Sequence, residues 1–219
     1  MSIDQSNFDP TRAPAREDVI SRGVRLGTAA TVIASFYASA PTMGMIDNFF
    51  NPELLEVWPL RDAISLSGIN QLLAGHDHQG PLRSDWLALY GYNAIAQPTE
   101  TQRGATPEVQ QKLGELYSRE NFSHIQVHNA PADHIAAELA FSGHLATQAA
   151  MSRRGSSSLA PLGGQLRDFL RNHLGPLAKG VVVDTEKHAT TITYRALVPL
   201  TRGYLAELAD FADYLAEGD

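Results

Sequence analysis

The sequence predicts an all-α protein, a helical bundle of about eight to ten helices. Through most of the chain, apolar residues recur three and four positions apart, which is the spacing of one helix face. Prolines and glycines fall between these stretches, where they would end helices. Only Val181-Val-Val-Asp184 has the composition of a strand, and it has no evident partner strand.

Four helices are expected in the first half of the chain. The first begins near Ala15, because apolar residues keep helical spacing as far as Tyr37, and Pro41 with Gly44 ends it. The other three are expected at 54–58, where Pro59 breaks the helix, at 61–74 and at 84–96. The segment 74–81 between the last two has the composition of a turn.

The second half is expected to hold five helices. They lie at 109–117, at 131–151, at 164–175 with Gly175-Pro176 closing it, at 185–197 and at 199–216. The loop expected at 152–161 is flexible by composition. It carries Arg153-Arg154, an internal pair with no apolar run behind it, which we interpret as a basic loop.

The length of the chain suits one all-α domain over residues 1–219, with flexible residues at 1–14. The polar connection at 97–107 has a length that becomes uncommon inside compact domains. It is the candidate hinge, and it would permit a domain-swapped dimer as well as a monomer.

Composition excludes several functions. The net charge is −7, which argues against nucleic acid or an anionic membrane as the main partner and suits a basic peptide. The chain has no cysteine, so disulfides, thiol nucleophiles and Cys-type zinc sites are excluded. The polar N-terminus is no secretory signal, and no apolar run long enough to span a membrane occurs.

The segment 129–141 combines features that a plain core helix lacks. Pro131 suits a first helical position, and Asp133 would then lie in the first turn, where a carboxylate meets unpaired backbone N–H groups. His134, Glu138 and Phe141 follow at helical spacing and share one stripe. This stripe mixes ionisable and apolar groups, which is typical of a binding surface.

The segment is similar to the Pro-x-Asp-His-x-x-x-Glu-x-x-Phe signature of the TorD/DmsD/NarJ-type family. These cytoplasmic chaperones mature molybdenum oxidoreductases, many of which are exported by the twin-arginine route. One position departs from the family, which often has Glu where this chain has Asn129.

Three other elements resemble the family in the same order, so that the resemblance extends over residues 20–215. Asp85-Trp-Leu-Ala-Leu-Tyr90 is similar to an acidic–aromatic element, and Pro98-Thr-Glu100 partly matches a Pro-Tyr-Glu-Ser element. Phe169-Leu-Arg-Asn-His-Leu174 resembles a Phe-x-x-x-His-Leu element, although Leu177 stands where an aromatic residue often follows.

The resemblance implies a chaperone without catalytic activity, cofactor or metal. It would hold a molybdopterin oxidoreductase subunit and bind that subunit's twin-arginine signal peptide, with carboxylates for the guanidinium groups and an apolar groove for the following segment. The residues expected to form this site are Trp86, Leu89, Tyr90, Pro98, Glu100, Pro131, Asp133, His134, Glu138, Phe141, Phe169 and His173.

Several of these residues have a structural alternative. Asp133 could be a helix cap, and His134 a buried structural histidine. Glu138 could pair with His134 or with an arginine. His173 could cap its own helix end, and Trp86 and Tyr90 could be half core and half groove.

Two other functions remain open on the sequence alone. A metal-dependent enzyme could use His124, His128, His134, Glu138 and His144, since His-x-x-x-His and His-x-x-x-Glu spacings bring two ligands to one ion. However, no His-Glu-x-x-His motif is present, and Pro131 separates the two pairs. The His76-Asp-His78 loop lacks further nearby ligands. A helical ligand-binding scaffold would also fit the fold.

Overall fold

The computed structural model describes residues 16–152 and 158–217. These residues form no strand, which confirms the all-α class and the expected number of helices. The expected flexible residues 1–14 and the Arg153-Arg154 pair lie outside the described residues. The α-helices are α1 (Arg16–Ala38), α2 (Met43–Phe49), α3 (Pro52–Glu56), α4 (Ala63–Leu73), α5 (Gln79–Tyr90), α6 (Glu108–Arg119), α7 (Ile135–Met151), α8 (Ala160–Phe169), α9 (Gly175–His188) and α10 (Ile192–Glu217).

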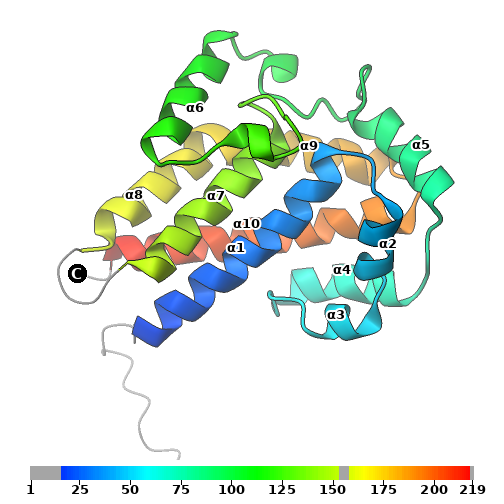
Figure 1. Cartoon of the computed structure of the whole chain (residues 1–219), viewed down its shortest axis with the longest axis horizontal. Helices are drawn as coiled ribbons and strands as arrows, with labels where there is room; N and C mark the ends of the chain where they lie inside the picture. The colour runs from blue at the N-terminus through cyan, green and yellow to red at the C-terminus, as the bar shows by residue number, and fades with distance from the viewer. Residues whose placement is uncertain (1–15, 153–157, 218–219) are drawn as a thin grey trace, which may run out of the picture.

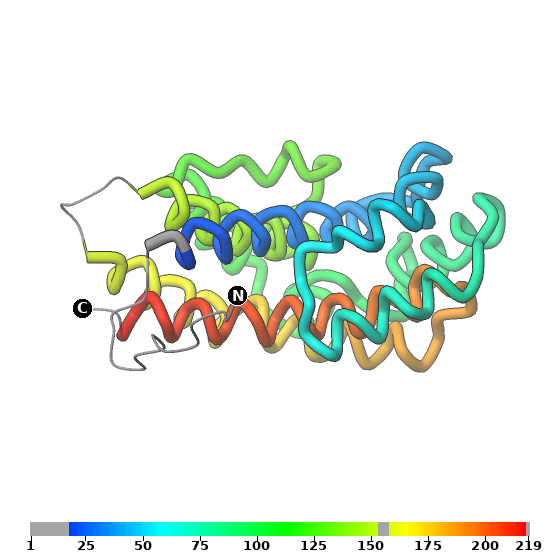
Figure 2. The backbone as a smooth tube through the Cα atoms, turned by 90° about the horizontal axis from the view of Figure 1, so that it is seen from below, coloured from blue at the N-terminus to red at the C-terminus, as the bar shows by residue number. Residues whose placement is uncertain are grey.

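The helices are stacked in two layers. α1 and α7 run side by side over α10, the longest helix, and α4, α8 and α9 flank α10 in the second layer (Figures 1 and 2). α6 lies beyond α7, at the outside of the first layer (Figure 1). In the described part of the chain, none of these helices is both long enough and apolar enough to cross a bilayer.

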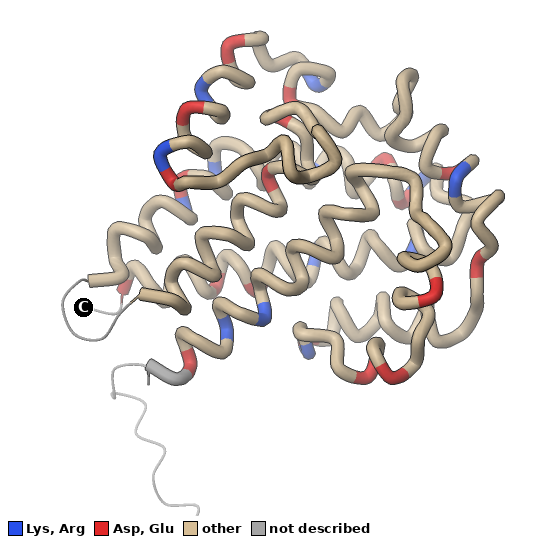
Figure 3. Tube along the Cα trace, in the orientation of Figure 1, with Lys and Arg blue, Asp and Glu red and all other residues tan. Residues whose placement is uncertain are grey.

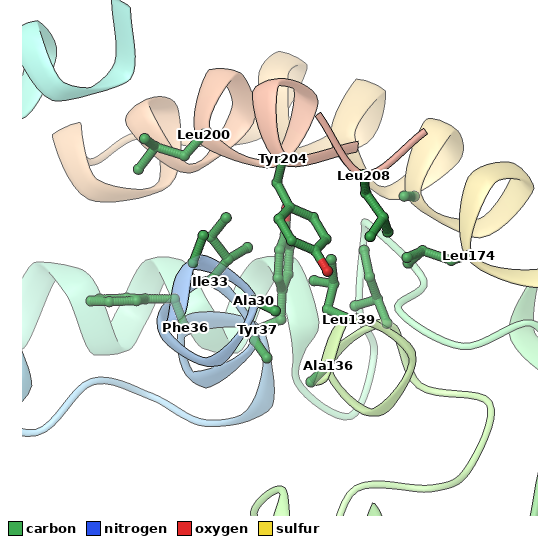
Figure 4. Close-up of a cluster of buried hydrophobic side chains, with 14 of the residues drawn as sticks. Ala30, Ile33, Phe36, Tyr37, Ala136, Leu139, Leu174, Leu200, Tyr204 and Leu208 are labelled. Carbon is green, nitrogen blue, oxygen red and sulfur yellow. The ribbon is translucent and has the colours of Figure 1, made fainter. Parts of the chain in front are cut away.

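The core lies between the layers. Figure 4 shows Leu200, Tyr204 and Leu208 of α10 pointing toward α1 and α7. Each such buried side chain contributes about 1.5–3 kcal/mol to folding. The Tyr204 hydroxyl lies 2.7 Å from the Ser142 hydroxyl on α7, so the phenol is buried with a hydrogen-bond partner.

The seam between α1 and α7 is built from small residues. A Cβ atom on Gly23 of α1 would lie 2.4 Å from the backbone oxygen of Ala146 on α7. A Cβ atom on Gly143 of α7 would lie 2.4 Å from the Cβ atom of Ala30 on α1. The two backbones therefore approach too closely for any larger side chain.

Several boundaries predicted from the sequence are wrong. Residues 181–184 are not a strand, because they lie inside α9. Gly175-Pro176 does not end a helix: the chain passes from α8 through a π-helical turn at Leu170–Leu174 directly into α9. Pro176 is tolerated there because it occupies the first turn of α9. The first helix ends at Ala38, before Pro41, and Gly44 lies within the next helix, α2.

The last two helices also divide elsewhere than predicted. Pro199 lies within α10, and the break between helices falls at 189–191. This break is fixed by tertiary contacts, since a carboxylate oxygen of Asp85 accepts hydrogen bonds from the backbone N–H groups of Thr190 and Thr191 at 3.0 and 2.9 Å. The helix predicted at 84–96 ends at Tyr90.

We expect Gly23→Ala to destabilise the protein by about 1–3 kcal/mol, because the added methyl group overpacks the seam between α1 and α7. Gly114→Ala is the matched control. It lies in the middle of α6 with no atom within 4 Å of its added Cβ, and should stabilise the protein by about 0.5–1 kcal/mol. Urea unfolding measures both, and equal effects of the two changes would contradict the close approach.

Candidate functional site

The candidate site is centred where the chain enters α7. The segment after Pro98 lies antiparallel to residues 133–135, with a bridge between Thr99 and His134. The Ile135 N–H donates to the Pro98 carbonyl at 2.8 Å, and the Glu100 N–H donates to the Asp133 carbonyl at 3.0 Å. Two stretches that the sequence separates by 32 or more residues are thereby joined through their backbones.

Asp133 connects the same two stretches through its side chain. One carboxylate oxygen accepts hydrogen bonds from the Thr101 N–H at 3.0 Å and the Thr101 hydroxyl at 2.7 Å. The other oxygen is buried without a partner among the described residues, and the side chain is 0% exposed. Asp133 therefore does not cap α7. Pro131 is exposed and precedes the helix, which starts four residues later than predicted.

His134 is the N-cap of α7. Its Nδ1 atom accepts a hydrogen bond from the Ala136 N–H at 3.1 Å, so the ring proton must sit on Nε2. Burial lowers the pKa of His134 from 6.5 to about 4, and the charge of Asp133 opposes this shift in part. The imidazole is thus held in its neutral form by its position.

Glu138 lies one turn further along α7, and its side chain is 0% exposed. Neither carboxyl oxygen has a hydrogen-bond donor as partner among the described residues. Burial raises the pKa of Glu138 well above its ordinary value, and the nearby carboxyl groups of Glu100 and Asp133 raise it further. Burial and the neighbouring carboxyl groups both disfavour the charged form, so Glu138 is buried as the neutral acid.

Glu100 extends this group of acids toward the surface. Its carboxylate lies 2.8 Å from Nδ1 of His173, which belongs to the π-helical turn between α8 and α9. The side chains of His173 and Glu100 are 26% and 15% exposed. Because both side chains are partly exposed, this pair is the accessible edge of the candidate site. Its position on a π-helical turn fits this role, since such turns often occur at functional sites.

An aromatic cluster packs around Phe141 of α7, one turn after Glu138. The buried ring of Phe141 packs on Tyr117 and Phe169, with centroids 4.6 and 5.0 Å away. The Tyr117 hydroxyl donates to the Ala132 carbonyl at 2.8 Å and so fixes the turn ahead of α7. Tyr117 and Phe122, the next ring of this cluster, were not predicted as site residues. Only the helical spacing of Tyr117 and the aromatic character of both residues point to them in the sequence.

The predicted residues of α5 have other neighbours. Leu89 and Tyr90 are buried, and the Tyr90 hydroxyl lies 2.7 Å from the Thr185 hydroxyl of α9. Trp86 is half-buried, and its indole N–H donates to the Tyr37 carbonyl at the end of α1 at 3.3 Å. These contacts place the three side chains in the packing of α5 against α1 and α9.

An open cleft of about 580 Å³ lies beside the acids, between α6 and the α8–π-helical segment. Two of the predicted residues, Phe169 and His173, line it. Its charged lining residues are Arg119, Glu120 and Asp168. Figure 3 shows acidic and basic positions alternating along α6, which forms one wall of the cleft.

The histidines proposed as metal ligands have other roles. His124 Nδ1 lies 2.8 Å from the Ala130 carbonyl oxygen, and His144 Nε2 lies 2.9 Å from the Glu120 carbonyl oxygen. The described residues contain no group of three or more histidine, aspartate or glutamate side chains placed to hold a metal ion. A metal-dependent enzyme is therefore not favoured.

Comparison with known families gives one match. Residues 83–182 match the family described as nitrate reductase delta subunit. This segment contains all twelve predicted site residues and runs from α5 into α9. The match supports the NarJ/TorD-type family of molybdoenzyme assembly chaperones, without separating its TorD and DmsD branches. Searches of curated proteins and of solved structures gave no match.

We expect acid to destabilise the wild type relative to His134→Asn. The histidine must be neutral to accept the Ala136 N–H, so its contribution is complete above pH 6.5 and is lost as the pH falls to about 4. Asparagine also accepts this bond but does not titrate. The difference in unfolding free energy between the two proteins should change by about 3 kcal/mol over this range.

Chemical denaturation at pH 7.5, 6.5, 5.5 and about 4 measures the difference, and titration of all other groups cancels in it. A difference that stays constant with pH would show that His134 is not held neutral.

Proposed function

We propose that this protein is a cytoplasmic chaperone for a molybdopterin oxidoreductase subunit and that it binds the subunit's twin-arginine signal peptide. The match over residues 83–182 supports the chaperone function. The observation that carries the peptide-binding proposal is the open cleft beside the Pro131–Phe141 signature, whose charged lining residues are Glu120, Asp168 and Arg119. It combines carboxylates with apolar side chains such as Leu116 and Pro161, which are the two features that an arginine pair followed by an apolar segment requires.

The exposed residues of the cleft are the first contacts for such a peptide. Asp168 is exposed, and its nearest cation, Arg171, is 3.9 Å away and also exposed, so the Asp168 carboxylate is available to a guanidinium group. Glu120 accepts a hydrogen bond from the Gln165 amide at 2.9 Å with one oxygen, which leaves the other oxygen for a partner. Leu116 and Pro161 supply apolar surface to the cleft, whereas Phe169 is almost fully buried.

Asp133 and Glu138 have a different part. Both are buried in this conformation, so a peptide bound in the cleft would not contact them directly. Their position supports an indirect role, because Asp133 holds Thr101 next to Glu100, which in turn contacts His173 at the cleft.

We expect a synthetic peptide with two adjacent arginines followed by about ten apolar residues to bind with a micromolar dissociation constant. The double variant Glu120→Gln/Asp168→Asn should bind it about tenfold more weakly or worse, because charge-assisted hydrogen bonds are lost. Asp47→Asn, which removes an exposed acid on α2, is the matched control. Calorimetry measures all three proteins.

Replacing both arginines of the peptide by glutamine should remove the difference between the double variant and the wild type. Equal loss of affinity in Asp47→Asn and in the double variant would mean that only net charge attracts the peptide, and the proposed cleft would be wrong.

A further inference from the structure

Residues 97–104 cover the buried acids and are held mainly by hydrogen bonds. Their backbone contacts with residues 133–135 are the two hydrogen bonds of Glu100 and Ile135, and the side chains of Asp133, His173 and Asp184 hold Thr101, Glu100 and Arg103. Pro98 and Thr99 are buried, but the large apolar residues of the core belong to other segments. This segment can therefore leave its place without opening the core.

Residues with a positive φ angle lie at both ends of the segment. Gln97 has φ 42° and Gly104 has φ 98°, so each lies in the left-handed region. Glycine adopts this region readily, whereas a residue such as glutamine is strained there. Movement of the segment would relieve this strain at Gln97.

The Arg103 side chain holds the C-terminal half of the segment in place. The Arg103 guanidinium donates to the Asp184 carboxylate of α9 at 2.7 Å and to the carbonyl oxygens of Ala96 and Gln97. It lies against Gly180, since a Cβ atom there would be 2.2 Å from the guanidinium. The ion pair is partly exposed on both sides, so solvent can compete for it.

Glu138 lies beneath this segment, and neither oxygen of its buried carboxyl group has a hydrogen-bond partner among the described residues. The ionisable groups that face it are Glu100 from the segment, Asp133 from the turn ahead of α7 and Tyr117 from α6. None of these brings a positive charge. An ionised Glu138 would require water or a cation, and either requires the cover to move.

We propose that residues 97–104 form a lid that opens as a unit and that its opening is coupled to ionisation of Glu138. In the closed form, burial raises the pKa of Glu138, and in the open form water restores the ordinary value. The open fraction therefore increases with pH, by at most about tenfold per pH unit for one proton. The open lid exposes the carboxyl groups of Glu138 and Asp133 to a cationic group from outside.

The lid concerns the free chain and does not rest on the proposed function. His134 acts in the opposite direction below pH 6.5, where exposure would let its imidazole gain a proton. Between pH 6.5 and about 8.5, His134 is neutral in both forms and does not contribute to the pH dependence. His173 also contacts the lid through Glu100, so the effect of Glu138 is isolated by comparing the wild type with Glu138→Gln.

Amide hydrogen exchange of the full-length chain, followed by NMR and corrected for intrinsic rates, tests this proposal. The N–H groups of Glu100, Thr101 and Ile135 report on the lid, because each donates across it. The N–H groups of Leu145 and Tyr204, inside α7 and α10, report on unfolding of the core. We expect the lid reporters to share one opening constant, larger than that of the core and increasing with pH.

Three variants separate the parts of the proposal. In the Glu138→Gln variant, the opening constant of the lid should not depend on pH. Glu115 is an exposed acid of α6, so the control variant Glu115→Gln should behave as the wild type. Arg103→Ala should raise the opening constant about tenfold or more at every pH, because a charged hydrogen-bonded contact is lost, with the pH slope unchanged.

Exchange of the lid reporters only together with the core reporters would overturn the lid as a separate unit. A pH slope retained in Glu138→Gln would overturn the coupling to its proton.

Discussion

The antiparallel contact between residues 98–101 and 133–135 is the constraint on which the candidate site depends. It sets the start of α7, because the Asp133 carboxylate accepts hydrogen bonds from Thr101 and is not available to cap the helix. His134 is the N-cap instead and accepts the Ala136 N–H. It also places Glu100 over Glu138 and within reach of His173. Without this contact, the acids of three separate segments would have no reason to lie together.

Gathering these acids is costly, because three carboxyl groups approach one another in a place from which water is largely excluded. The protein reduces this cost by placing each acid in a different local environment. Asp133 receives two donors from Thr101, Glu100 has a histidine, and Glu138 keeps its proton. An arrangement that only had to be stable would use apolar residues here, and the α1–α7 seam shows that this chain builds such contacts elsewhere. The retained acids therefore favour a functional role.

The matched segment and the rest of the chain contribute different parts of the structure. Residues 83–182 carry the site, its cleft and the lid. α1 and α10, which lie largely outside that segment, supply the core against which α7 packs. The site thus belongs largely to helices whose positions are set by packing, and its irregular parts are the lid, the turn ahead of α7 and the π-helical turn. The lid and the π-helical turn touch through Glu100 and His173, so movement of the lid would reach the accessible cleft directly.

Residue spacing by itself determined the all-α class, because amphipathic periodicity needs no knowledge of the partner surface. It also placed His134, Glu138 and Phe141 on one stripe, but all three side chains are buried, so the stripe is not the exposed binding surface that the sequence indicated. Only the tertiary structure decided that Asp133 bonds to Thr101, that Val181-Val-Val-Asp184 is helical, and that Leu89 and Tyr90 are buried apart from the acids. These outcomes depend on contacts between residues far apart in the chain, and local propensity is too weak to fix them.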